Sequence, residues 1–269
     1  MEKFRNVLLA SDLDGTLLNS EHQIDRENRD AIRYFVENGG TFTVATGRPT
    51  NVAKPYFDEL AINAPVILYN GGAIYDLKTE RMLYLKKLGD GFFGAAKDVM
   101  RRFPEVGVEF HTLDEIYLAS YSEASKNHFE IIHKEFVLTP IDEIRSPVIK
   151  GLFTQSPDYL VDVAQYFEEK FRGQYSMTSS FPFFLEITDK NVHKGNALTE
   201  LSKLLHVDKS RICVVGDSFN DVEMFGAAGM SCAPENASEE IKKQASFVVA
   251  DNDHFALAGA VEILDRKYS

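Results

Sequence analysis

A short apolar run that ends in two aspartates and a glycine constrains the fold of this chain more than any other feature. The segment reads Val7-Leu8-Leu9-Ala10-Ser11-Asp12-Leu13-Asp14-Gly15-Thr16. The run is long enough for a buried strand, and Gly15 permits a sharp turn after it. Two carboxylates one residue apart at such a turn can hold a hard cation and still leave one oxygen free to attack an electrophile. A turn with two solvated aspartates is the simpler alternative, and the rest of the chain disfavours it.

The same pattern of an apolar strand followed by a polar turn recurs along the chain. Strands are expected over residues 7–11, 41–45, 66–69, 211–215 and 246–250. Helical patterns lie between them: Asp25 can cap one that ends at Asn38-Gly39-Gly40, another covers Lys194–Leu205, and Ser238 can cap a third. In open α/β sheets the carboxyl ends of the strands line the ligand site. We therefore predict an α/β fold with a doubly wound parallel sheet.

The middle of the chain does not show these strand-end turns. It has helical stretches over 92–103 and 159–171, and strand-like runs over 106–111, 116–119, 148–154 and 183–188. We interpret residues 86–187 as an α/β cap inserted into a catalytic core that comprises residues 1–85 and 188–269. The cap is expected to determine substrate specificity.

Composition narrows the class of protein and its partners. The 269 residues carry a formal net charge of −12, which argues against nucleic acid or an anionic membrane as a partner. An anionic small substrate remains compatible, because a metal ion and a few basic groups reverse the local field. Cys213 and Cys232 lie in or near apolar segments and are expected to be buried thiols. With no signal-peptide pattern and no membrane-spanning stretch, we expect a cytoplasmic protein, either a monomer or a small homo-oligomer.

Four separated segments point to a single site. Besides the aspartate pair, they are Thr46-Gly47-Arg48 after the second strand, Lys194 at the start of a helix, and Gly216-Asp217-Ser218-Phe219-Asn220-Asp221 after the strand 211–215. Each has an ordinary structural explanation by itself: a helix cap, a surface lysine or a capping turn. Together they supply a nucleophile, a metal site, an anion cradle and a cation, which are the parts that phosphoryl transfer needs.

These motifs, in this order and spacing, resemble the haloacid dehalogenase superfamily of aspartyl-phosphate phosphatases. The insertion after the second motif, the turn Asn70-Gly71-Gly72-Ala73 and the stretch Lys194-Gly195-Asn196-Ala197-Leu198 resemble the Cof-type subgroup of sugar-phosphate phosphatases. The resemblance implies a Mg²⁺-dependent phosphatase of small phosphorylated metabolites. A phosphomutase that uses the same aspartyl-phosphate is the alternative, since the motifs do not separate the two reactions. A non-catalytic binding module would require one of the key residues to be replaced, and none is.

The resemblance also implies a role for each motif residue. Asp12 is the nucleophile, and Asp14 protonates the leaving alcohol and then activates water. Mg²⁺ is held by Asp12, the backbone carbonyl of Asp14 and Asp217, with Asp221 close by. The phosphate is held by Thr46, Gly47, Lys194 and Asn220, with help from the amide of Leu13.

Other segments depart from the family pattern or carry no motif. Cys232-Ala233-Pro234-Glu235-Asn236-Ala237 and Asp251-Asn252-Asp253-His254-Phe255-Ala256 replace the usual sequences there, and are expected to alter a loop at the edge of the site. His111, His128 and His133 lack the spacing of metal ligands, so we interpret them as surface or otherwise satisfied side chains.

Overall fold

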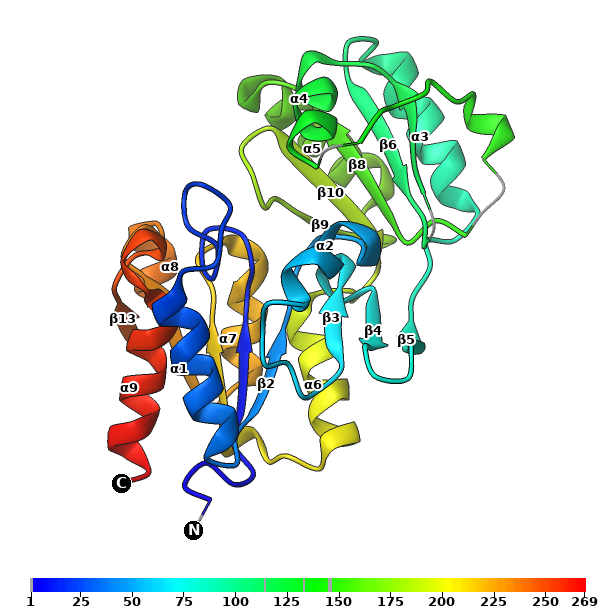
Figure 1. Ribbon diagram of the computed structural model, residues 1–269. Coiled ribbons are helices and arrows are strands. Elements are labelled where there is room, and N and C mark those ends of the chain that lie inside the picture. Colours follow the sequence, from blue (N-terminus) through cyan, green and yellow to red (C-terminus); the bar gives the residue numbers. More distant parts are fainter. Residues whose placement is uncertain (1, 114, 133, 145–146) are drawn as a thin grey trace. The chain divides into compact units, whose positions relative to one another are not determined.

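The chain folds into two compact units. The computed structural model describes residues 2–113, 115–132, 134–144 and 147–269 (Figure 1). The first unit comprises Met1–Arg48, Ala53–Tyr84 and His193–Ser269, and the second comprises Pro49–Val52 and Leu85–Val192. The insertion predicted over 86–187 lies inside the second unit, which continues to Val192.

A parallel five-stranded sheet forms the centre of the first unit, as predicted. Its strands, in spatial order, are β13 (Phe247–Val249), β12 (Met230–Pro234), β11 (Ile212–Val215), β1 (Leu8–Ser11) and β2 (Thr41–Val44). Every residue of β1 and β11 is buried, because helices cover both faces of the sheet. This two-sided burial is why these strands are continuous apolar runs and do not alternate.

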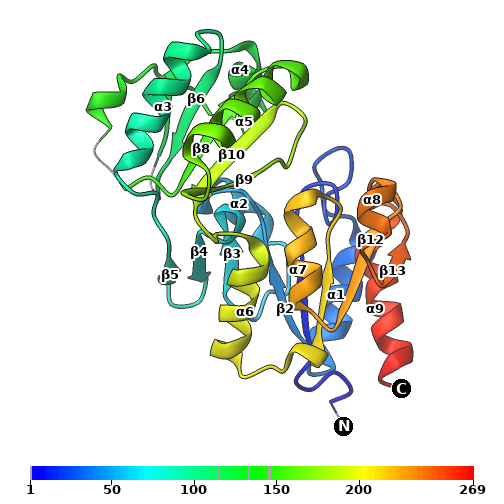
Figure 2. The same cartoon turned by 180° about the vertical axis from the view of Figure 1, so that it is seen from behind.

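Two pairs of helices cover the two faces of this sheet. On one face lie α1 (Arg26–Glu37) and α9 (Ala256–Lys267), and on the other lie α6 (Lys194–Leu205) and α7 (Val222–Ala227), as the two opposite views show (Figures 1 and 2). The short helix α8 (Glu239–Lys242) is capped by Ser238, as predicted. Asp25 stands at the N-cap of α1 but makes no side-chain cap bond. Its carboxylate instead accepts a hydrogen bond from Asn19.

A smaller antiparallel sheet follows α2 (Thr50–Phe57), a helix whose residues are divided between the two units. It consists of β3 (Val66–Leu68), β4 (Ala73–Asp76) and β5 (Arg81–Leu85). A parallel bridge from Ala45 to Ile67 connects β3 to the end of β2. The turn between β3 and β4 contains Asn70 and Gly71, both with positive φ.

The second unit is built on an antiparallel sheet in the order β7-β6-β8-β10-β9. Its elements are α3 (Gly91–Arg102), β6 (Gly107–His111), β7 (Ile116–Ser120), α4 (Glu123–Ile131), β8 (Lys150–Thr154), α5 (Pro157–Phe171), β9 (Tyr175–Thr178) and β10 (Phe184–Asp189). Helices α3 and α5 pack on the face that carries Phe110 and Phe153. The opposite face of β6 carries Glu109 and His111, because side chains alternate along a strand.

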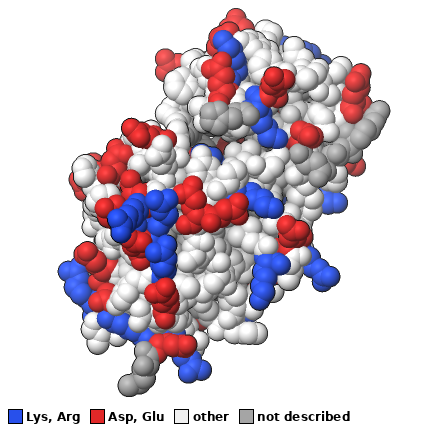
Figure 3. All heavy atoms as spheres, in the orientation of Figure 1, with Lys and Arg blue, Asp and Glu red and all other residues white. Residues whose placement is uncertain are grey.

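The two cysteines are buried, as expected, and the charged side chains are mixed in sign on one face. On the face shown in Figure 3, acidic and basic side chains are interspersed over both units. Cys213 and Cys232 are buried and form no disulfide. Within the described residues, no helix combines the length and apolarity that crossing a lipid bilayer requires.

Candidate active site

Asp12 follows directly after β1, and a buried lysine fixes its carboxylate. Its backbone N–H donates to Val215 and so continues the parallel ladder to β11. Lys194, at the first turn of α6, donates from Nζ to Asp12 Oδ1 at 2.6 Å and to Asp221 Oδ1 at 2.7 Å. The Lys194 side chain is 0% exposed. A lysine is unfavourable at a helix N-terminus, and these two carboxylates account for its position.

The turn after β11 presents Asp217 and is held in place by Asp221. Asp221 Oδ2 accepts the backbone N–H groups of Asp217 and Ser218 at 3.0 and 3.1 Å. Thr16, from the turn after β1, donates its hydroxyl to Asp217 Oδ1 at 2.7 Å. The first and fourth motifs are therefore tied together by hydrogen bonds between side chains 201 residues apart in sequence.

The site concentrates negative charge in a buried place. Burial and the neighbouring carboxylates raise the pKa of Asp12 well above its usual value, although Lys194 opposes the shift. Burial and Asp221 raise the pKa of Asp217 to about 7. Burial would lower the pKa of Lys194, but Asp12 and Asp221 outweigh it and raise that pKa, so the lysine is protonated. Three carboxylates thus share one ammonium group, and this excess of negative charge suits a divalent cation.

Asp14 forms an ion pair with Arg48 that the sequence did not predict. Arg48 donates from Nε to Asp14 Oδ2 at 2.8 Å, and its terminal nitrogen bonds the other oxygen. The guanidinium also lies over the ring of Tyr56, 4.9 Å from the centroid. Arg48 was part of the second motif, but nothing in its sequence position indicated a forked ion pair with the first motif.

Thr46 and Gly47 lie at a crowded turn that Asn70 organises. The Thr46 side chain is buried, and its hydroxyl oxygen accepts the Arg48 N–H at 3.1 Å. A Cβ on Gly47 would approach Asn70 Oδ1 to 2.8 Å, so a larger residue at this position would displace the Asn70 side chain. Asn220 donates from its side-chain amide to the same Asn70 oxygen at 3.1 Å. In this arrangement Asn220 connects two turns, and its predicted contact with phosphate stays a prediction.

The segments that depart from the family pattern support the turn after Asp14. Asn236 donates to the Gly15 carbonyl at 2.8 Å, and its own side-chain oxygen accepts the Asn252 N–H at 3.0 Å. The carbonyl of Leu13 accepts backbone bonds from the two residues 17 and 18. The amide of Leu13, predicted to contact phosphate, follows Asp12 in this turn.

Comparison with known proteins identifies the family. The family model of haloacid dehalogenase-like hydrolases matches residues 9–261. This chain belongs to the haloacid dehalogenase-like hydrolases. A putative phosphatase of Bacillus subtilis, YxeH, is 29% identical over 96% of this hydrolase and 97% of its own length. Another B. subtilis protein, named 5-amino-6-(5-phospho-D-ribitylamino)uracil phosphatase YwtE, is 32% identical over 95% of this chain and 97% of its own.

Solved structures show the same fold. A haloacid dehalogenase-like hydrolase from Bacteroides thetaiotaomicron superposes with a TM-score of 0.84 at 27% identity, covering 97% of this chain and 99% of its own. TM0651 from Thermotoga maritima superposes with a TM-score of 0.79 at 28% identity, covering 96% and 97%. The predicted membership of this superfamily, its Cof-type branch included, and the α/β fold class are confirmed.

The donor set of this haloacid dehalogenase-like hydrolase fits a hard divalent cation. Asp12, Asp217 and Asp221 each offer an oxygen, and these oxygens lie within 4.8 Å of one another. Carboxylate oxygens are the ligands that Mg²⁺ prefers. Both oxygens of Asp221 already accept hydrogen bonds. Asp221 is therefore better placed to hold Lys194 and the turn, and its predicted part in the metal site stays a prediction.

The interpretation of the cap histidines needs correction. His111 is 1% exposed, and its Nδ1 has no hydrogen-bond partner among the residues that the structure describes. It is therefore neither a surface residue nor a fully satisfied one. His128 is partly buried and bonded to Glu109, and His133 lies outside the described residues. Spacing in sequence could not reveal this group, because its members come from a strand and from a helix.

Proposed function

We propose that this protein is a Mg²⁺-dependent phosphatase that hydrolyses small phosphorylated metabolites, sugar phosphates in particular, through an aspartyl-phosphate on Asp12. One observation carries the proposal: a buried carboxylate at the end of β1 is held at one oxygen by Lys194, and the carboxylate of Asp217 is close by. This arrangement supports the proposal, because phosphoryl transfer requires a nucleophile, a cation and metal ligands close together.

The first half of the reaction transfers the phosphoryl group to the enzyme. The Asp12 oxygen that is not bonded to Lys194 attacks phosphorus, and the bond from phosphorus to the substrate oxygen breaks. Asp14 gives its proton to the departing oxygen, so the product leaves as a neutral alcohol. For this step the Asp14 carboxyl has to leave its pair with Arg48. Lys194 offsets charge on the phosphoryl oxygens, and Thr46 and Gly47 bind them.

The second half regenerates the carboxylate. Asp14 removes a proton from a water molecule, which attacks phosphorus. The bond from phosphorus to Asp12 breaks, and inorganic phosphate leaves. The same carboxyl therefore serves as acid and then as base.

The metal would be held by the carboxylates of Asp12 and Asp217 together with the backbone carbonyl of Asp14. When bound, Mg²⁺ offsets the negative charge that would otherwise repel a phosphate from these carboxylates. The raised pKa of Asp12 and of Asp217 supports this assignment, because it reflects carboxylates that repel one another in a buried place.

The substrate class is inferred from the relatives. Two curated relatives, 32% and 26% identical, are named as phosphatases of 5-amino-6-(5-phospho-D-ribitylamino)uracil, which carries its phosphate on a ribityl group. We assign this chain to phosphate monoesters of sugars and sugar-like chains, and we assign the choice among them to the second unit.

The test is a panel of phosphorylated metabolites assayed with Mg²⁺ and with a chelator. It includes hexose and pentose phosphates, the ribitylaminouracil phosphate and an aryl phosphate. We expect free phosphate to be released with Mg²⁺ and not with the chelator. In acid-quenched enzyme, the phosphoryl group should be found on the peptide that contains Asp12. An isomeric sugar phosphate formed without free phosphate would show the phosphomutase alternative instead, and the absence of both products would refute the proposed function.

A further inference from the structure

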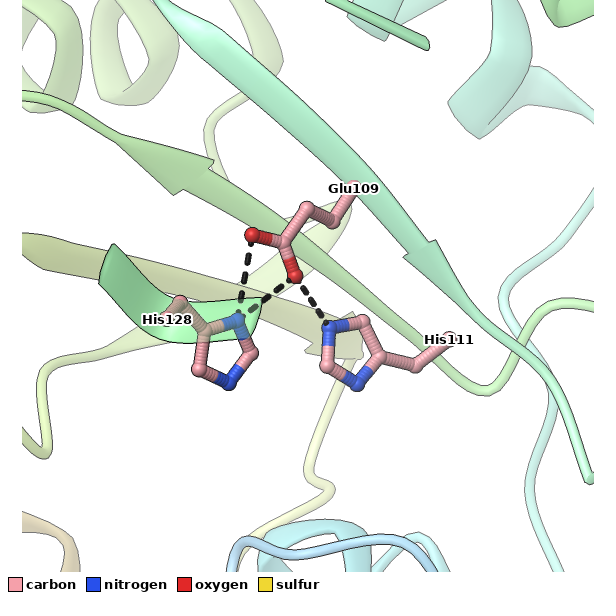
Figure 4. A group of neighbouring side chains, drawn as sticks. All are labelled: Glu109, His111 and His128. Carbon is pink, nitrogen blue, oxygen red and sulfur yellow. Dashed lines mark hydrogen bonds and ion pairs between the residues drawn. The ribbon is translucent and has the colours of Figure 1, made fainter. Parts of the chain in front are cut away.

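A buried group of two histidines and one glutamate lies in the second unit, outside the residues discussed for catalysis. Glu109 and His111 are two residues apart on β6, so both project from the same face of the strand. His128 comes from α4, which packs against β6. Figure 4 shows both imidazole rings directing one nitrogen toward the Glu109 carboxylate.

The distances bring three ligand atoms together. His111 Nε2 lies 3.0 Å from Glu109 Oε2, and His128 Nδ1 lies 2.9 Å from the same oxygen and 3.1 Å from the other. The two rings are nearly parallel, with centroids 5.9 Å apart. Tetrahedral zinc, with bonds of about 2.0–2.1 Å, separates its ligand atoms by about 3.4 Å. The two histidine–glutamate separations would need to lengthen by only a few tenths of an ångström to suit such an ion, and all three ligand atoms already lie within 4.8 Å of one another.

Hydrogen bonding alone satisfies this group poorly. If both ring nitrogens that face Glu109 carry protons, the neutral ring of His111 has a bare lone pair at Nδ1. That atom is buried and has no partner in the described part of the chain, and in Figure 4 it lies on the side of the ring away from Glu109. A cation between the three groups would take the lone pair of Nε2 and place the proton on Nδ1, which has no described partner in that state either.

Glu109 and His111 are 0% and 1% exposed, and the nearby lysine of the sheet is engaged outside this group. Lys150 stands opposite His111 in the sheet register. Its ammonium group is engaged with Glu186 at 2.7 Å.

We propose that Glu109, His111 and His128 form a binding site for a divalent transition metal of the zinc type. Two imidazole nitrogens and one carboxylate form a three-ligand set that zinc uses in proteins, with a fourth position for water. The ion would join α4 to β6. Its site is separate from the carboxylate set of the first unit, which lacks histidine and suits Mg²⁺.

The test measures Zn²⁺ binding to the full chain after all metals are removed with a chelator. The Asp217→Asn variant weakens the acidic site of the first unit, so the remaining binding reports on the second unit. We expect wild type and Asp217→Asn to share one binding event that His128→Gln and Glu109→Gln weaken by at least ~10–100-fold, the cost of losing even an outer partner of a metal site. His254→Gln, which removes an exposed histidine, is the matched control and should bind Zn²⁺ like wild type.

Co²⁺ supplies a second readout that does not depend on altering the three ligands. In the Asp217→Asn chain, Co²⁺ at this site should give the strong visible absorption of a four-coordinate ion, and Zn²⁺ should displace it. Circular dichroism verifies that the variants are folded. The proposal is overturned if Asp217→Asn abolishes all Zn²⁺ binding, if a folded His128→Gln chain binds Zn²⁺ as wild type does, or if Co²⁺ shows only the weak spectrum of a six-coordinate ion.

Discussion

At the scale of single residues, Asp12 is placed where chemistry and stability oppose each other. Asp12 is 5% exposed, and its carboxylate lies beside two other carboxylates and one lysine. The pKa of Asp12 is raised in the folded protein. The free energy of unfolding of the metal-free protein therefore falls as the pH rises through that pKa and Asp12 ionises. An active enzyme needs this carboxylate ionised, so a cation at the site would serve both stability and reaction.

Asp12→Asn should therefore abolish turnover without destabilising the metal-free protein. An amide cannot act as the nucleophile, so we expect a loss of at least ~10⁴-fold in kcat. Removing one of three crowded carboxylates should leave the thermal unfolding temperature in chelator equal to or above that of wild type. Activity is measured as phosphate release and stability by circular dichroism. Activity within about tenfold of wild type would exclude Asp12 as the nucleophile.

Asp14→Asn should impair catalysis in a way that depends on the leaving group. Loss of the general acid should lower kcat by about 10²–10⁴-fold for a sugar phosphate. The loss should be much smaller for an aryl phosphate, whose leaving oxygen needs no proton. The ratio of the two losses is the measurement, and it removes any effect of the variant on folding or on metal binding. Equal losses for both substrates would contradict the assigned role.

At the scale of elements, the turn between β3 and β4 determines where α6 begins. Gly71 has a φ of +97°, and a Cβ there would approach the His193 carbonyl oxygen to 2.4 Å and the Lys194 nitrogen to 3.1 Å. The turn is thus packed against the start of α6, the helix that carries Lys194. Backbone contact of this kind cannot be relieved by rotating a side chain.

Gly71→Ala should consequently lower both stability and activity. We expect a cost of about 1–3 kcal/mol from the strained backbone, together with reduced kcat because Lys194 is displaced. Gly226→Ala is the control: it lies in α7, has no atom within 4 Å of the added Cβ, and should be neutral or slightly stabilising. Denaturant unfolding and phosphate release are measured for both variants. If the two variants have the same stability and the same activity, the contact between Gly71 and the start of α6 matters for neither.

The sequence predicted best those elements that have a regular apolar pattern. Strands β1 and β11 and helix α6 were predicted to within a residue, because buried apolar runs and helical spacing are strong local signals. Strand β12 was missed because Met230–Pro234 has no run of large apolar residues and contains small residues, a serine and a proline. Its backbone pairing with β11 leaves no signal in the sequence. Helix α4 was missed because its exposed sequence has few apolar positions, although Ser122 caps it.

The candidate site was predictable as a list of residues but not as a network. Position after strands indicated the aspartates and Thr46, because the carboxyl ends of parallel strands meet. Lys194 was indicated by its unfavourable place at the start of a helix. It gave no information on which side chains pair. The forked bond from Arg48 to Asp14, and the bond from Asn220 to Asn70, depend on rotamers and on contacts between distant segments.

At the scale of the whole molecule, the chain forms two compact units, to which we assign different tasks. The proposed chemistry lies entirely in the first unit, and every residue assigned to a catalytic step belongs to it. We therefore predict that replacing Leu85–Val192 by the equivalent segment of YxeH changes the order of preference among sugar phosphates. The rate with a small aryl phosphate should change much less.

For the chimera and for both parent proteins, kcat/KM is measured over the same substrate panel. Asp12→Asn in the chimera is the control for contaminating phosphatases. Preferences identical to those of the present chain would assign specificity to the first unit and refute the prediction.

The discontinuity of the first unit has a consequence for the order in which the protein can mature during synthesis. Strand β1 pairs on one side with β2, which follows within about forty residues of chain, and on the other with β11, which begins at Ile212. A ribosome that has reached Val192 has delivered the whole of the second unit's main segment, together with Asp12 and Asp14. It has not yet delivered Lys194, Asp217 or the strand that closes the sheet. A growing chain that ends at Val192 thus carries the proposed nucleophile without the groups that would make it reactive, and the proposed activity would require Lys194 and Asp217 to be made first.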